Sequence, residues 1–231
     1  MRFIRIFIGL LLLSFPIFAE SESFHTIHLS FPLETRTLKT SDSHSRKYFD
    51  FDKTCKANYF GAFANWNRLS FKESGFSFLF GLEAGFTAAN IPDVSSDFFI
   101  GGILNTFGGK FGFGYAPLRN EKYILAFHGF SELKGFFLDY DTKYKVANIS
   151  DDLNYTIQEF SFISGFDCVF IAKLSEKITL LTGLDISTIV LGFGSLDVTR
   201  SGSTDDSEEI SYTNFFNGIN VCPRLGLCFG F

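Results

Sequence analysis

The sequence has no apolar run long enough to cross a membrane as a helix. Such a helix needs about 20 consecutive apolar residues, whereas the apolar run near the N-terminus covers only residues 6–15. Cysteine is also scarce, with four residues in 231, and no spacing among them resembles a zinc site. Cys222 and Cys228 would lie about 20 Å apart on an extended strand, too far for a disulfide. These shortages argue against a helical membrane protein and against a zinc-stabilised or disulfide-stabilised domain.

The chain also lacks a large excess of either charge. Its formal net charge is −5, and it contains no basic stripe or polybasic run. Proteins that bind nucleic acid need such positive surfaces, so we expect no nucleic-acid partner. Phenylalanine and glycine are abundant instead, with 33 and 21 residues, and they repeatedly fall on opposite faces of the same extended segments.

The N-terminal residues have the pattern of a secretory signal peptide. Two arginines precede the apolar run 6–15, and Ala19 supplies the small residue before an expected cleavage site. We therefore expect residues 1–19 to be a signal peptide and residues 20–231 to form one domain. About 212 residues are enough for a single closed barrel.

Period-two alternation dominates the rest of the chain and predicts an all-β protein. The predicted strands cover residues 24–33, 56–71, 76–88, 98–116, 123–138, 155–174, 178–196 and 211–231. Long polar loops (34–55, 89–97, 139–154 and 197–210) alternate with short turns (72–75, 117–122 and 175–177). Splitting the fifth strand at Ser131–Gly135 gives nine strands, but an even number is typical of bacterial membrane barrels. The alternation of long and short links is also typical of them.

The polar face of these strands predicts which side points outward. It is rich in small residues with isolated charges, unlike the lysine-rich and glutamate-rich exterior of a soluble barrel. Hydrocarbon offers no partner to an open sheet edge, so we predict a closed antiparallel up-and-down transmembrane β-barrel of eight strands with its apolar face toward lipid. We expect a polar network in its lumen, made of Glu83, Lys110, His128, Glu132, Lys134, Glu159, Asp167, Asp185 and Arg224.

The last strand carries the clearest resemblance to a known class. Leu225, Leu227 and Phe229 alternate and end at Phe231, which resembles the C-terminal assembly signal of bacterial outer-membrane proteins. The whole mature chain is similar to the small eight-stranded families typified by outer-membrane proteins A, W and X. The resemblance implies a location in the bacterial outer membrane, contact with outer-membrane lipid, and recognition by the barrel-assembly machinery during biogenesis.

The sequence gives little support for catalysis. The lipid A deacylases resemble this fold and use a His-x-Ser pair, whereas His128 and Ser131 are three residues apart and face opposite sides of a strand. The glycines of Gly108–Gly114 lack the strand-turn-helix context of a phosphate loop. We predict no catalytic, metal or cofactor site and no enzymatic activity.

Three functional hypotheses remain open at this point. The first is a narrow passive channel for small solutes, because eight strands leave an interior that side chains nearly fill. The second is a non-conducting structural or surface-interaction barrel, with an extracellular ligand on the loops 34–55, 139–154 and 197–210. The third is a soluble secreted barrel that binds a ligand.

Removal of the terminal aromatic ring tests the assembly signal. Phe231→Ala is expected to lower the amount of barrel inserted in the outer membrane, because the ring belongs to the segment that the assembly machinery reads. Quantitative blotting of isolated outer membranes measures the effect, and unchanged insertion would contradict this role.

Overall fold

The computed structural model of the chain describes residues 22–39, 54–91, 98–100, 102, 104–146, 149–175, 178–201 and 206–229. The predicted signal peptide and Phe231 lie outside these residues. Within them, no helix is long and apolar enough to span a membrane. The strands are β1 (Glu22–Ser30), β2 (Leu33–Lys39), β3 (Thr54–Phe71), β4 (Phe76–Asn90), β5 (Phe98–Ile100), β6 (Thr106–Arg119), β7 (Tyr123–Val146), β8 (Ile149–Lys173), β9 (Thr179–Ser201) and β10 (Asp206–Phe229).

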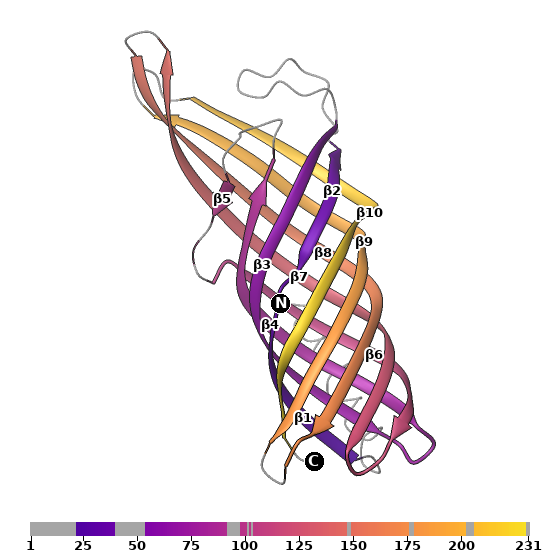
Figure 1. Cartoon of the computed structure of the whole chain (residues 1–231). Helices are drawn as coiled ribbons and strands as arrows, with labels where there is room; N and C mark the ends of the chain where they lie inside the picture. Colours follow the sequence, from indigo (N-terminus) through magenta and orange to yellow (C-terminus); the bar gives the residue numbers. More distant parts are fainter. Residues whose placement is uncertain are drawn as a thin grey trace, which may run out of the picture.

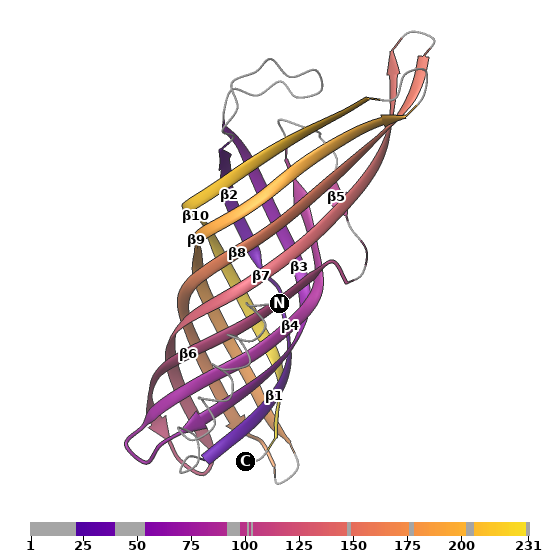
Figure 2. The ribbon, with the colours of Figure 1, turned by 180° about the vertical axis from the view of Figure 1, so that it is seen from behind.

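The strands close into a ring with eight positions. β1 and β2 both lie between β10 and β3, so they are two parts of one position. β5 and β6 both pair with β4 and share another position. The other neighbours follow chain order, and every pairing is antiparallel. The result is the closed up-and-down barrel that Figures 1 and 2 show from two sides.

Tight turns join the strands at the lower end of the barrel in Figure 1. Between β3 and β4, the Gly75 N–H donates to the Lys72 carbonyl at 2.9 Å, and Gly75 has a φ of +86°, which glycine adopts without steric cost. Between β6 and β7, the Asn120 side-chain oxygen accepts the N–H groups of Lys122 and Tyr123 at 2.9 and 2.8 Å. Both turns follow from local chemistry that the sequence displays.

The predicted fold class is confirmed. The described strands form one closed antiparallel barrel, and eight positions account for all of them. The stretch Ser131–Gly135 lies inside β7, which runs without interruption from Tyr123 to Val146. The split of the fifth predicted strand at Ser131–Gly135 is therefore wrong.

Two of the predicted loops are largely strand, and a third contains strand at its ends. β2 occupies part of 34–55, β7 and β8 extend through most of 139–154, and β9 and β10 occupy both ends of 197–210. β7 to β10 have 24, 25, 23 and 24 residues, or roughly 80 Å of extended chain, although about 10 residues suffice to cross a bilayer. The loop prediction was wrong because the strands continue beyond the membrane, where polar residues on a wet face resemble loop sequence.

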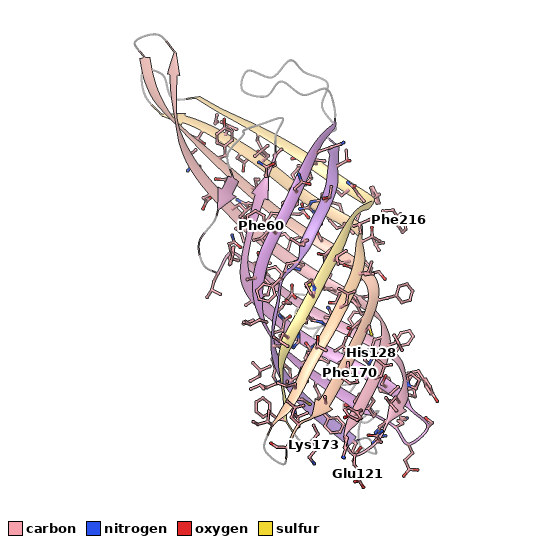
Figure 3. All side chains as sticks on the ribbon, viewed as in Figure 1. Phe60, Glu121, His128, Phe170, Lys173 and Phe216 are labelled. Atoms are coloured by element: carbon pink, nitrogen blue, oxygen red, sulfur yellow. The ribbon has the colours of Figure 1, made fainter. Side chains whose placement is uncertain are left out.

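The outer wall of the lower and middle barrel is apolar. The outward-facing side chains of this apolar belt include Leu29, Phe111, Phe113, Phe127, Leu133, Phe166, Leu184, Ile186, Leu225 and Leu227. Phe166 is 77% exposed, and Phe160, Phe193 and Phe215 are more than half exposed at the upper margin of the belt. Figure 3 places Phe216 at the outer surface of the wall as well, and Glu121 and Lys173 at the lower end. An exterior of this kind is typical of a membrane barrel, not of a soluble secreted one.

Asparagine side chains bridge two interruptions in the ring. Where β10 diverges from β2, the Asn217 side-chain oxygen accepts the Thr37 N–H at 3.2 Å and its amide donates to the Thr37 carbonyl. Between β5 and β6, Asn105 makes the same pair with the Thr87 backbone at 2.7 and 2.8 Å. A side-chain amide offers one acceptor and a donor, like a peptide group, so each asparagine replaces a missing strand neighbour.

A cation on the outer wall tests the position of the belt. Leu184→Arg is expected to destabilise the barrel by about 2 to 4 kcal/mol, because Leu184 lies on the lipid face of β9. The matched control is Gln158→Arg on the outer face of β8 above the belt, which should change stability by less than about 1 kcal/mol. Guanidinium unfolding of the barrel in lipid vesicles measures both. Equally small effects would show that Leu184 does not face hydrocarbon.

Candidate functional site

Two apolar layers and a set of buried ion pairs fill the barrel interior. The upper apolar layer consists of Leu38, Ala57, Tyr59, Ala89, Ile91, Phe136, Leu138, Tyr155, Ile157, Leu196, Val198 and Tyr212. The lower apolar layer consists of Phe24, Leu69, Phe71, Leu79, Ala116, Ile124, Ala126, Phe130, Ile163, Val169, Ile171, Leu181, Ile189 and Cys228. Buried charged residues pair across several strands, and we call them the ionic layer: Arg36, Glu83, Lys110, Glu132, Lys134, Glu159, Asp167, Asp185 and Arg224. The polar interior that the sequence predicts is therefore only part of what fills the barrel, and apolar side chains flank it, as Ile163 and Val169 flank Asp167 on β8.

A chain of ion pairs crosses the lumen in the ionic layer. Lys110 of β6 pairs with Asp185 of β9, and Arg224 of β10 contacts Asp185 at 2.9 Å and pairs with Asp167 of β8. The four side chains are at most 9% exposed. Buried charges are tolerated only with partners of opposite sign, so this chain fixes four strands relative to one another.

His128 connects these ion pairs to a serine. Its Nε2 lies 3.0 Å from Ser77 Oγ, and its Nδ1 lies 3.5 Å from Asp167 Oδ2. The order serine, histidine, carboxylate matches the roles in a hydrolase triad, but all three residues are at most 1% exposed and Asp167 is already paired with Arg224. Ser131 lies on the opposite face of β7, as its spacing predicts. The geometry leaves no place for a substrate, so the contacts stabilise the barrel.

Lys134 forms a second ionic group with two glutamates. Its Nζ lies 2.7 Å from Glu83 Oε1 and 3.2 Å from Glu132 Oε1. Gly108 faces this group, and a Cβ there would lie 3.0 Å from Glu83 Cγ and 3.1 Å from Glu132 Oε1. The glycine therefore makes room for two inward-pointing carboxylates.

Arg36 and Glu159 form a third group below the upper apolar layer. The Arg36 guanidinium pairs with Glu159, and its Nε lies 3.5 Å from Glu34. Glu159 also accepts hydrogen bonds from the Ser161 hydroxyl and, at 2.9 Å, from the Tyr212 hydroxyl. Glu159 therefore has three donors from three different strands, which satisfies a carboxylate buried away from water.

Aromatic rings cover three of the interior cations. The contacts, measured to the ring centroids, join Arg36 to Tyr59 at 3.9 Å, Lys110 to Phe130 at 4.2 Å and Lys134 to Phe63 at 4.5 Å. Each cation therefore lies between a carboxylate and a ring face, an arrangement that adds cation–π attraction to the ion pair. An interior cavity lined by Arg36, Lys134 and Glu159, among others, has a volume of only about 20 Å³, room for about one water molecule.

A larger concave site lies outside the barrel, above the apolar belt. This outer groove has a volume of about 580 Å³ and is lined by Thr156, Gln158, Ser195, Asp197, Thr199, Ser207 and Glu209. All of these residues lie on the outer faces of β8, β9 and β10, and all are polar. The groove is therefore suited to a polar ligand rather than an apolar one.

The structure places all nine predicted lumen residues on the inner face of the wall, in the three groups described above. It adds Arg36, Ser77 and Tyr212, which the sequence analysis missed. Arg36 fell inside a predicted loop, although Glu34, Arg36 and Leu38 alternate with threonines and could have indicated a strand.

The residues of the predicted assembly signal lie at the seam of the barrel. Leu225, Leu227 and Phe229 are on the outer face of β10, and their strand pairs with β1. This position places them where the ring closes. Their recognition during assembly stays a prediction.

Among the described residues, no group of three histidine, cysteine, aspartate or glutamate side chains is arranged to hold a metal ion. Cys168, Cys222 and Cys228 are free thiols. The outer groove and the ionic layer are therefore the two candidate sites that side-chain chemistry offers.

No family model and no curated protein sequence matches the chain. Among solved structures, it is similar to the outer-membrane protease OmpT from Escherichia coli, with 8% identity, a TM-score of 0.40, and 91% of this chain and 97% of that chain covered. It is also similar to the outer-membrane protein OprG from Pseudomonas aeruginosa (10% identity, TM-score 0.34, 91% and 97% covered). A third is an outer-membrane channel from Pseudomonas putida F1, with 10% identity, a TM-score of 0.27, and 87% of this chain and 95% of that chain covered. The architecture and apolar exterior described above are those of a transmembrane β-barrel.

Removal of the Glu159 carboxylate tests the ionic layer. Glu159→Ala is expected to destabilise the barrel by about 3 to 5 kcal/mol, because it leaves the buried Arg36 guanidinium without its main partner. Glu22→Ala is the control: the Glu22 side chain is 63% exposed and pairs with Arg119, so its loss should cost at most about 1 kcal/mol. The midpoints of unfolding in detergent micelles are measured for both variants. A similar loss of stability in the two variants would contradict the buried pairing.

Proposed function

We propose that this protein is a non-conducting outer-membrane barrel that acts through a rigid sheet held above the membrane. The observation that carries the proposal is that the outer face of β8 to β10 changes from apolar in the belt to polar above it. Below the margin marked by Phe160 and Phe193, apolar side chains point outward; above it, Gln158 and Asp197 point outward and Val198 points inward with 0% exposure.

The filled interior argues against a channel. A permeating ion would have to pass two apolar layers and break ion pairs that are almost completely buried. Breaking such a pair without replacing the partner is costly, because each charge is then left unpaired in a medium of low dielectric constant. The arrangement supports the non-conducting hypothesis over the narrow passive channel.

The extension above the belt has its own apolar core. Leu138, Ile157, Leu196 and Val198 from β7, β8 and β9 pack together with Tyr59 of β3 on the inner side. An apolar inner face and a polar outer face are what a water-exposed sheet needs. The long strands β7 to β10 therefore extend above the belt as an ordered sheet, visible at the top of Figures 1 and 2.

The side of the membrane follows from the connections. Short turns join the strands at the lower end, and the long extension is at the other end. Barrels of this class have short periplasmic turns and longer extracellular connections. The extension and its outer groove therefore face the outside of the cell, where a surface-interaction protein needs them.

Electrical recording tests the proposal directly. The folded barrel inserted in a planar lipid bilayer is expected to give no reproducible current steps, because side chains fill its lumen. Heat-dependent mobility on a gel verifies that the sample is folded, and a porin added to the same bilayer verifies that conductance can be detected. Reproducible steps from the folded barrel would overturn the non-conducting assignment.

A further inference from the structure

The outer groove lies close above the aromatic margin of the belt, on the same face of the same strands. Thr156 is four residues beyond Phe160, and Asp197 is four residues beyond Phe193. Four residues of strand span about 13 Å, which a tilt of roughly 40° reduces to about 10 Å above the margin. This is the level of lipid headgroups, so the groove faces the headgroup region of the leaflet around it.

The floor of the groove brings two carboxylates together. Asp197 pairs in register with Thr156 on one side and with Glu209 on the other. Side chains directly opposite each other on one face lie about 5 Å apart, and like charges there repel. The described lining contains no cation that would offset this repulsion.

The acceptor capacity of these carboxylates is only partly used. Ser195 donates to Asp197 Oδ2 at a long distance of 3.4 Å, whereas Asp197 Oδ1 is buried and has no hydrogen-bond partner among the described residues. A ligand that supplies neutral donors would bond to the accessible oxygens of the two carboxylates, of which Glu209 is the more exposed. An anionic group would be repelled by the same two side chains.

The rest of the lining fits a ligand that both donates and accepts. Thr156, Thr199, Ser195 and Ser207 carry hydroxyl groups and Gln158 carries an amide, each of which can donate and accept. Sugar hydroxyls have the same dual capacity. A neutral saccharide therefore matches the lining, whereas an acyl chain or a phosphate does not.

Building on the extracellular role proposed above, we propose that the outer groove binds the neutral saccharide headgroup of a glycolipid in the surrounding leaflet. The acyl chains of that lipid would lie against the apolar belt below the groove, and the sugar would donate hydrogen bonds to Asp197 and Glu209. We infer a membrane-anchored sugar, not a free one, because the groove lies at the height of the lipid headgroups above the belt.

Native mass spectrometry of the whole barrel released from detergent tests this inference. The probe is digalactosyldiacylglycerol, compared with phosphatidylcholine carrying the same acyl chains. The barrel is expected to retain the galactolipid at least about tenfold more strongly, and the combined variant Asp197→Asn and Glu209→Gln should lose that preference, because hydrogen bonds to charged acceptors are the strong ones.

Two further variants separate recognition from folding. Glu121→Gln changes a carboxylate in the turn at the opposite end of the barrel, and its lipid preference should stay unchanged. Thr199→Val removes a hydroxyl from the groove while keeping the shape that suits a strand, and it should lower the preference several-fold. Heat-dependent gel mobility confirms that each variant is folded.

Four results would overturn the inference. Equal retention of both lipids would show that only acyl chains bind, and equally tight binding of free digalactose would remove the role of the membrane. A preference that disappears on chelation of divalent cations would assign the carboxylates to a metal, and one that survives in the combined variant would place recognition elsewhere. Each of these results leaves the bilayer recording, and with it the non-conducting role, unaffected.

Discussion

The need to pair every backbone amide inside hydrocarbon is the constraint on which the whole structure depends. Hydrocarbon offers no hydrogen-bond partner, so the sheet must close, and β10 must meet β1 and β2 even though Pro32 interrupts them. Phe31 still donates to the Pro223 carbonyl at 3.0 Å beside this break. The Asn105 and Asn217 side chains complete the pairing where strand neighbours are missing. Closure determines the register, and the register determines which side chains share the lumen.

Once the ring is closed, each of the longest strands passes through two environments. In the belt, phenylalanines face outward and the lumen holds both apolar side chains and the paired charges. Above the belt, the outer face is polar and the interior is an apolar core. The charges left in the lumen are stable because the cations have carboxylate partners, and Arg36 also has the ring of Tyr59. This filling supports the proposed non-conducting role and places His128 out of contact with solvent. The proposed function therefore uses the surface outside the barrel.

Much of the membrane part could be predicted because its physics is local and periodic. Alternation along β9 is enough to place Leu184 in lipid and Asp185 in the lumen, and Gly75 and Asn120 indicate their turns. The upper halves of the strands could not be predicted in the same way. There the outer face is polar and the segments resemble loops, so Arg36 was assigned to a connection instead of the lumen.

The sequence by itself determined the closed all-β barrel, its apolar outer face and the inward position of nine charged or titratable residues. It could do so because a strand alternates strictly and lipid requires apolar side chains on one face. Only the tertiary structure decided which charges pair, how completely the lumen is filled, and that three strands form a polar groove above the belt. Those properties depend on register between strands that are distant in sequence, as when Thr156, Asp197 and Glu209 come into one row. No local pattern records such a register, since it is set by closure of the whole ring.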